Sequence, residues 1–346
     1  MINVYILCGG PSSEHDIALR SALNIYKNLD KEKYDVKVVY IDKEGKFSNS
    51  YIPNNVEDEF DLVKEVSINK AESIAKFLNE ISKLDKDNTI VIPAIHGVYG
   101  EDGTIQGFLD VIGINYIGNG LLSSVLCMDK ASANDIFAVN NIDQAKYLVA
   151  TKANLNDDFI DKCINDIGLP LIVKPSANGS SLGVARVDKK EELKDAILFA
   201  SKYDKKVLVE ELIDGQEIEI AVIGQGNDLD VTLPAAYKTK NVFLDYDAKY
   251  FDQETIEELP YQMDDEDMKK ARDFAKKCYQ ILGCEGFARV DIFYTKDSKL
   301  YINEINTFPG FTKSSFFPRL AMNFYDESFS SILDRLIENA FRSKND

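Results

Sequence analysis

The chain has 346 residues, of which 45% are apolar and 28% charged, values that are ordinary for a soluble globular protein of two or three domains. The formal net charge is −18 and no cluster of lysine and arginine occurs, which argues against binding to a nucleic-acid backbone. Five cysteines without a C-x-x-C pair argue against a disulfide framework or a structural zinc site and favour free thiols in a reducing cytoplasm.

The N-terminal stretch predicts a first strand rather than a signal peptide. It lacks a basic segment, and no run in the chain approaches the ~20 apolar residues of a membrane span, so membrane insertion is not expected. The predicted elements here are strands over 3–8 and 36–41, a helix over 14–29 and a glycine turn at Gly9-Gly10. This βαβ order predicts a parallel sheet that binds its ligand at the glycine turn.

The start of the first helix carries polar residues with two interpretations. Ser13 is predicted to cap the helix, with Asp16 three residues further on at the spacing of a capping box. Glu14 lies in the first helical turn, where it either satisfies the helix dipole or holds a substrate cation. The pattern by itself favours the dipole.

A histidine and a glycine-rich loop follow the next buried strand. The predicted elements are a polar surface excursion over 48–66, a helix over 71–84, a strand over 88–95, a helix over 104–112 capped by Thr104, and a strand over 114–117. His96 and the loop through Gly103 follow the strand over 88–95, the position at which α/β sheets bind ligands. The two histidines of the chain, His15 and His96, each flank one such loop.

Two lysines and a loop of small residues mark the middle of the chain. The predicted elements are one helix over 121–140, a helix over 157–167 and a strand over 169–174. Lys174 precedes the loop 176–183, whose backbone N–H groups could cradle phosphate beside the lysine charge. Neither a Walker A motif nor G-x-G-x-x-G occurs, so a nicotinamide-binding site has no support. Lys130 lies on the predicted helix, where a lysine is usually solvated.

The third part of the chain contains a long aromatic and polar segment. The predicted elements are strands over 184–187, 206–213 and 217–224 and helices over 189–203, 263–282 and 328–341. Residues 238–258 show no regular period, and a segment of that length is typical of a lid or binding loop. Tyr246, Lys249 and Tyr250 favour a lid.

A predicted hairpin over 286–312 directs four polar side chains to one volume. Because strand side chains alternate, Arg289 and Asp291 share one face of the first strand, and Glu304 and Asn306 share one face of the second. Buried charges are costly unless they are paired or bind a metal, and oxygen ligands beside an arginine suit Mg²⁺ carrying phosphate. The alternative is a surface hairpin with a salt bridge, and these residues alone do not decide between the two.

Seven motifs, taken together and in order, resemble those of D-alanine–D-alanine ligases, which belong to the ATP-grasp superfamily. They are GGPSSEHD (9–16), HGVYGEDGTIQG (96–107), MDK (128–130), VKPSANGSSLGV (173–184), DYDAKY (245–250), RVD (289–291) and NEINTFPGFTKSS (303–315). The resemblance covers essentially the whole chain. It implies an α/β fold of three domains, a Rossmann-like pre-ATP-grasp domain over 1–118 and two ATP-grasp subdomains over 119–212 and 213–346.

The resemblance also implies a reaction and a cellular setting. ATP would phosphorylate the carboxylate of one D-alanine, and the amine of a second D-alanine would attack the acyl phosphate. The product would supply peptidoglycan synthesis in the cytoplasm, and the chain would form a homodimer. Positioned cations and hydrogen-bond donors should provide most of the catalysis, because both steps build negative charge.

The site residues implied by the resemblance fall into four groups. The ligands of two Mg²⁺ (or Mn²⁺) ions would be Asp291, Glu304 and Asn306, and the oxyanion would be held by Arg289 and the N–H of Gly310. The ATP contacts would be Lys130, Lys174, Lys249, Glu210, Glu211, Ile213 and Glu217. The first D-alanine would be held by Glu14 near His96, with Ser180 and Tyr250 joining Glu14 to the lid. The carboxylate of the second substrate would be received by Ser315.

Several positions depart from the family pattern and keep other acceptors open. The departures are Ala18, Leu244, Phe316, Phe317 and Ala321. The last three end the final motif close to the second-substrate residues, so D-serine or D-lactate are alternative acceptors. Tyr250 argues for an amine acceptor. A relative that binds nucleotide without catalysis is the remaining alternative.

Overall fold

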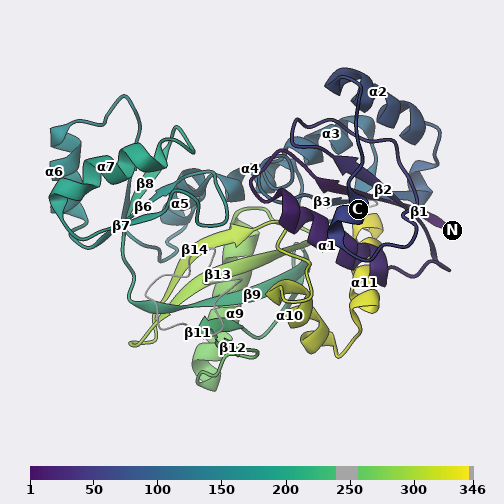
Figure 1. The fold of residues 1–346 in the computed structure, drawn as a ribbon. Helices are drawn as coiled ribbons and strands as arrows, with labels where there is room; N and C mark the ends of the chain where they lie inside the picture. The colour runs from purple at the N-terminus through teal and green to yellow at the C-terminus, as the bar shows by residue number, and fades with distance from the viewer. Residues whose placement is uncertain (239–255, 343–346) are drawn as a thin grey trace.

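The computed structural model of the chain describes residues 1–238 and 256–342, which form three four-stranded sheets and one two-stranded sheet (Figure 1). The first sheet, with its helices, lies at one end of the molecule, the second sheet with α6 and α7 lies at the other, and the third lies between them. The predicted mixed α/β class is confirmed. The domain boundaries stay a prediction.

The first sheet is parallel and has the strand order β2-β1-β3-β4. Its elements are β1 (Ile2–Gly9), α1 (His15–Asn28), β2 (Tyr34–Ile41), η1 (Glu59–Leu62), α2 (Lys70–Ile81), η2 (Lys86–Asn88), β3 (Thr89–Ala94), α3 (Thr104–Ile112) and β4 (Asn115–Tyr116). The predicted parallel βαβ unit is therefore confirmed. The excursion predicted over 48–66 is less superficial than expected, because Leu62 is fully buried in the core.

Both capping predictions for these helices were wrong. α1 has no side-chain cap, and Ser12 rather than Ser13 makes the local contact, accepting a hydrogen bond from the Glu14 N–H at 3.1 Å. α3 begins at Thr104 without a side-chain cap, because Gly103 precedes it in a left-handed conformation and Asp102 accepts the Thr104 N–H. In each case the side chain that accepts the N–H belongs to the residue two positions earlier, Ser12 or Asp102, and not to the predicted capping residue.

The second sheet is antiparallel, with the order β5-β8-β6-β7. Its elements are β5 (Tyr147–Ala150), α6 (Asp157–Asp166), β6 (Leu171–Pro175), β7 (Ala185–Val187), α7 (Lys190–Ala200) and β8 (Val207–Glu211). Residues from both helices and all four strands share one core. The strand β5 was not predicted from the sequence.

The helix predicted over 121–140 is two helices, α4 (Leu121–Met128) and α5 (Lys130–Val139), which meet at Asp129. Asp129 leaves the helical conformation, and its side chain accepts hydrogen bonds from the Ser132 N–H and the Ser176 hydroxyl and pairs with Lys206. These contacts with the second sheet favour the break over a continuous helix. The break places Lys130 at the first position of α5.

The third sheet is antiparallel, with the order β10-β9-β13-β14. The remaining elements are β9 (Gly215–Gln225), β10 (Asp228–Val231), β11 (Ala236–Lys238), β12 (Ile256–Glu258), α9 (Asp265–Ile281), β13 (Phe287–Thr295), β14 (Leu300–Asn306), α10 (Phe316–Tyr325) and α11 (Phe329–Arg342). The predicted hairpin is confirmed as β13 and β14. Neither β10 nor α10 was predicted. The two ends of the segment 238–258, predicted to be irregular, belong to β11 and β12, which pair with each other.

The C-terminal helices join the third sheet to the first. Side chains of α10 and α11, including Phe317 and Leu333, share one core with Val4 of β1 and Phe287 of β13. In Figure 1 the yellow α11 lies beside α1. Among the residues that the structure describes, no helix is long and apolar enough to cross a membrane.

Candidate active site

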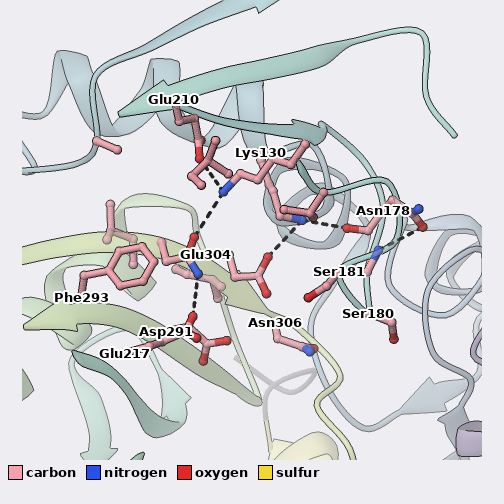
Figure 2. A pocket seen from close by; sticks show the side chains of 18 of the residues that line it. Lys130, Asn178, Ser180, Ser181, Glu210, Glu217, Asp291, Phe293, Glu304 and Asn306 are labelled. Carbon is pink, nitrogen blue, oxygen red and sulfur yellow. Dashed lines mark hydrogen bonds and ion pairs between the residues drawn. The ribbon is translucent and has the colours of Figure 1, made fainter. Parts of the chain in front are cut away.

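One cavity of about 660 Å³ gathers residues from all three large sheets and their loops (Figure 2). The predicted site residues that line it are Glu14, His96, Lys130, Lys174, Ser180, Glu210, Glu211, Ile213, Glu217, Arg289, Asp291, Glu304, Asn306 and Gly310. These residues are separated by up to almost 300 positions in the chain. Lys249, Tyr250 and Leu244 lie outside the described residues, as does most of the predicted lid segment 238–258.

The hairpin of β13 and β14 lines one wall of the cavity. Arg289 pairs in register with Asn306, and Asp291 with Glu304, so the four polar side chains lie together as the alternation predicted. A β-bulge follows, because the register steps from Glu304 to Ile302 and leaves Asn303 as the extra residue. Asn303, which was not predicted, donates to Glu217 at 2.6 Å and accepts from Lys174 at 3.3 Å.

Two lysines, the buried Lys130 of α5 and the partly buried Lys174 of the second sheet, approach this wall. The Lys130 Nζ lies 3.0 Å from Glu304 Oε2 and donates to the Asn178 carbonyl at 3.0 Å. The Lys174 Nζ lies 2.7 Å from Glu210 Oε2. Its position on a helix favoured a solvated Lys130, whereas the family resemblance implied an ATP contact. The structure places Lys130 in the cavity, at the start of α5.

The lysines determine the charge state of Glu304. Burial alone would raise the pKa of the Glu304 carboxyl, but Lys130, Lys174 and Arg289 lower it from 4.5 to about 2. Burial likewise opposes the charge on Lys130, and Glu304 and Glu210 outweigh it, so the pKa of Lys130 lies above its usual value. Glu304 and Lys130 are therefore both charged at neutral pH.

Arg289 is shared between two carboxylates. Its Nε and Nη2 donate to the two oxygens of Asp291 at 2.7 and 2.6 Å, and its Nε lies 2.9 Å from Glu219 Oε2. Burial and the neighbouring Glu219 raise the pKa of Asp291 to about 7 despite the guanidinium. Glu219, on β9, was not predicted, although it faces the same side of the strand as the predicted Glu217.

Glu14 lies at the other end of the cavity, beside the loop that follows β6. The Ser180 hydroxyl donates to Glu14 Oε1, and a Cβ on Gly179 or on Gly97 would approach Glu14 Oε2 to 2.7 or 2.9 Å. Burial, followed by the charge of Glu101, raises the pKa of Glu14. The two glycines thus leave space for the Glu14 carboxylate, whose pKa lies above its usual value because the group is buried.

Both ring nitrogens of His96 contact the protein. Nδ1 lies 3.0 Å from the Phe308 carbonyl and 3.4 Å from Glu101, and Nε2 lies 2.9 Å from the Ser21 hydroxyl. Burial would lower the pKa of His96, but Glu101 and Glu14 raise it above 6.5 overall. Because Ser21 also accepts the Phe311 N–H, His96 and Ser21 hold the turn that contains Gly310.

The residues predicted to bind the base and ribose follow one another at the end of β8 and the start of β9. Glu210 accepts from Lys174 and from the Asn134 amide, and Glu217 accepts from Asn303. Glu211 and Ile213 line the same part of the cavity. Their assignment to a nucleotide stays a prediction.

Ser315 does not line the cavity but adjoins it through Gly310. Its hydroxyl accepts the Thr312 N–H at 3.1 Å, and a Cβ on Gly310 would lie 2.6 Å from Ser315 Oγ. Ser315 also precedes α10 as its N-cap residue. The backbone N–H groups of that helix start lie beside it, which is compatible with the predicted role toward a carboxylate.

The donor set near the hairpin fits a hard cation that carries phosphate. Asp291, Glu304 and Asn306 supply two carboxylates and an amide, and Mg²⁺ usually takes one or two carboxylates with phosphate and water. Over residues 1–238 and 256–342, no group of three or more histidine, cysteine, aspartate and glutamate side chains is placed to hold a metal alone.

Comparison with known proteins identifies relatives along the whole chain. The family model "D-ala D-ala ligase N-terminus" matches residues 3–119, and "D-ala D-ala ligase C-terminus" matches residues 136–338. The D-alanine–D-alanine ligase of Finegoldia magna is 43% identical over 97% of this chain and 94% of its own length.

Two solved structures are similar in both fold and sequence. The D-Ala:D-Ser ligase VanG of Enterococcus faecalis superposes with a TM-score of 0.81 at 31% identity, covering 98% of this chain and 99% of its own. The D-alanine–D-alanine ligase of Bacillus anthracis in complex with ATP superposes with a TM-score of 0.77 at 27% identity, covering 100% of this chain and 99% of its own.

Proposed function

The chain belongs to the D-alanine–D-alanine ligase family, and we propose that its cavity joins two D-alanine molecules with conversion of ATP to ADP and phosphate. The fold is that of the ATP-grasp ligases. The dipeptide would serve peptidoglycan synthesis. The observation that carries the proposal is the single cavity in which Glu14, Lys130, Lys174, Arg289 and the hairpin carboxylates meet.

The first step transfers the γ-phosphoryl group of ATP to a carboxylate oxygen of the first D-alanine. Lys130 and Lys174 would contact the phosphates, since both line the cavity and can exchange a carboxylate partner for a phosphate oxygen. Glu210, Glu211, Ile213 and Glu217 would hold the base and ribose. Lys249 would reach the γ-phosphate.

Asp291, Glu304 and Asn306 would hold two Mg²⁺ or Mn²⁺ ions, which when bound would neutralise charge on the phosphate oxygens. Glu14 would bind the ammonium group of the first D-alanine. Its raised pKa suits this role, because a carboxyl without a cationic partner is costly to ionise in a buried site. The Ser180 hydroxyl would orient it, with Tyr250 as the further contact toward the lid.

The second step forms the peptide bond. The neutral amine of the second D-alanine attacks the acyl carbon, the C–O bond to phosphate breaks after the tetrahedral intermediate, and the amine loses a proton. Arg289 and the Gly310 N–H would stabilise the oxyanion, because both line the cavity next to the hairpin. His96 and Ser21 would keep Gly310 in place, and Ser315 would receive the carboxylate of the second substrate.

Phosphate release tests the ligase proposal against nucleotide binding without catalysis. The purified protein is incubated with ATP, Mg²⁺ and D-alanine, and phosphate is measured with D-alanine omitted as the control. We expect release that depends on D-alanine and formation of the dipeptide. The absence of D-alanine-dependent release at any pH from about 6 to about 9 would contradict the proposal.

D-alanine is the proposed acceptor. The departures at Phe316, Phe317 and Ala321 are buried in the core and, like Ser315, do not line the cavity. Apolar sites reject an added hydroxyl only weakly, so D-serine is the relevant competitor. Mass spectrometry of products formed from equal D-alanine, D-serine and D-lactate would show mainly D-alanyl-D-alanine, and a majority of another product would overturn this assignment.

A further inference from the structure

A buried carboxylate on β9 contacts the catalytic arginine without reaching the cavity. Glu219 is 3% exposed and pairs in register with Asp291 of the neighbouring strand. Arg289 and Asp291 line the cavity, whereas Glu219 does not. Burying a carboxylate in the middle of a sheet is costly unless its charge is compensated, so its ion pair with Arg289 at 2.9 Å needs a reason beyond packing.

Arg289 is held by two carboxylates, Glu219 and Asp291, which come from different strands. β13 is the strand between β9 and β14, so Glu219 approaches the guanidinium from β9 while Asp291 binds it from β13 itself. Asp291 holds the stronger position, with two hydrogen bonds of 2.6 and 2.7 Å. In the ligand-free protein Glu219 is therefore the second of two counter-ions.

The relative importance of the two anchors changes if Asp291 binds a cation, as proposed above. An oxygen of Asp291 that faces a divalent ion cannot keep its full hydrogen bond to Arg289, and the ion repels the guanidinium. Arg289 would then lose its paired hydrogen bonds to Asp291 at the stage when it must contact the oxyanion. Glu219 shares this face of the sheet but does not line the cavity, so it can keep its contact with Arg289 when the cavity is filled.

We propose that Glu219 is a positioning residue that holds Arg289 in its catalytic orientation when Asp291 is engaged by metal and nucleotide. This inference rests on the proposed ligase function. It assigns Glu219 an effect on the tetrahedral intermediate, transmitted through Arg289, and little effect on nucleotide affinity. A purely structural role would instead lower stability alone, and a role in metal affinity would shift the Mg²⁺ dependence.

The test compares Glu219→Gln with Asp267→Asn as a matched control. Asp267 is also a buried carboxylate of this domain and accepts the hydroxyl of Tyr294 on β13, but it does not contact Arg289. Two binding constants are measured by calorimetry. One is for a phosphinate analogue of D-alanyl-D-alanine, whose tetrahedral phosphorus carries an oxyanion, in the presence of ADP and Mg²⁺, and the other is for the nucleotide with Mg²⁺.

For Glu219→Gln we expect analogue affinity to fall by about 10-fold or more, and kcat to fall with it, while nucleotide affinity and the Mg²⁺ midpoint change by less than about 3-fold. In Asp267→Asn analogue affinity should stay at the wild-type value. In an Arg289→Ala background the Glu219→Gln change should have no further effect on analogue affinity, because its effect passes through Arg289.

The outcomes separate this inference from the function on which it rests. Wild-type analogue affinity in Glu219→Gln, an equal loss in Asp267→Asn, or an unchanged loss in the Arg289→Ala background would overturn the positioning role. A wild-type protein that neither binds the analogue nor releases phosphate with D-alanine would instead overturn the ligase proposal. If Glu219→Gln does not fold, Glu219→Asp provides the same comparison, because it keeps the charge but withdraws it by one methylene from Arg289.

Discussion

Replacing Glu304 by glutamine separates the proposed metal role of this residue from its role in stability. The carboxylate is paired with Lys130 at 3.0 Å, and the surrounding cations lower its pKa from 4.5 to about 2. Since each pKa unit corresponds to about 1.36 kcal/mol, the charged form is favoured by at most about 3 kcal/mol. The side chain is 29% exposed, so screening by solvent reduces the expected loss in Glu304→Gln to about 1–2 kcal/mol.

The sign of this contribution follows from the lowered pKa. A carboxyl with a depressed pKa in the folded state stabilises the fold above its unfolded value of 4.5, and the contribution is lost as the pH falls toward 2. At pH 7.5 the variant should therefore show the full loss, a fall of a few degrees in the thermal midpoint. The two proteins should converge only as the pH reaches about 2.

Turnover should respond far more strongly than stability. A glutamine amide is a weaker ligand for a hard cation than a carboxylate, so kcat should fall by about 100-fold or more and the Mg²⁺ concentration for half-maximal rate should rise. The double variant Lys130→Met, Glu304→Gln should regain stability, because both buried partners are removed, and should remain inactive. Wild-type turnover of Glu304→Gln with an unchanged Mg²⁺ midpoint would refute the metal assignment.

Two further predictions concern the substrate end of the cavity. Because carboxylates raise the pKa of His96, protonation of His96 stabilises the fold below pH 6.5, and this contribution is lost as the pH rises through the folded pKa. NMR titration of the two histidines should show a His96 midpoint above 6.5 that falls in Glu101→Gln. An unchanged midpoint in that variant would contradict the assignment. Gly310→Ala would place a Cβ 2.6 Å from Ser315 Oγ and should raise the KM of the acceptor about 10-fold with little change for ATP, and equal changes for both substrates would argue against an acceptor role.

The polar wall of the cavity could be predicted because its information is local. A period of two places Arg289 with Asp291 and Glu304 with Asn306, and the register of β13 and β14 then brings the pairs together. The parallel first sheet followed from the βαβ order in the same way. The specific roles of Glu14, Lys130 and the base-binding residues came from the family resemblance, and the structure adds that they share one cavity with the hairpin.

The errors arose where distant residues decide a local structure. Apolar spacing continues across Asp129, so the sequence predicts one helix, but contacts of Asp129 with Ser176 and Lys206 on the second sheet favour a break. Capping by Ser13 and Thr104 failed because the neighbouring Ser12 and Asp102 make the hydrogen bonds instead. Capping motifs predict that a helix begins nearby more reliably than which side chain caps it.

The residues that were missed entirely are defined by strand register. Nothing in the sequence around Glu219 distinguishes it from a glutamate on a solvent-facing strand, and only the pairing of β9 with β13 places it opposite Asp291. The same charges in turn favour that pairing. A slip of one residue would turn Glu219 to the opposite face and leave Arg289 or a carboxylate buried without its counter-ion, a larger penalty than exchanging one apolar contact for another. The ion cluster of Arg289, Asp291 and Glu219 therefore helps to specify the sheet that positions this arginine.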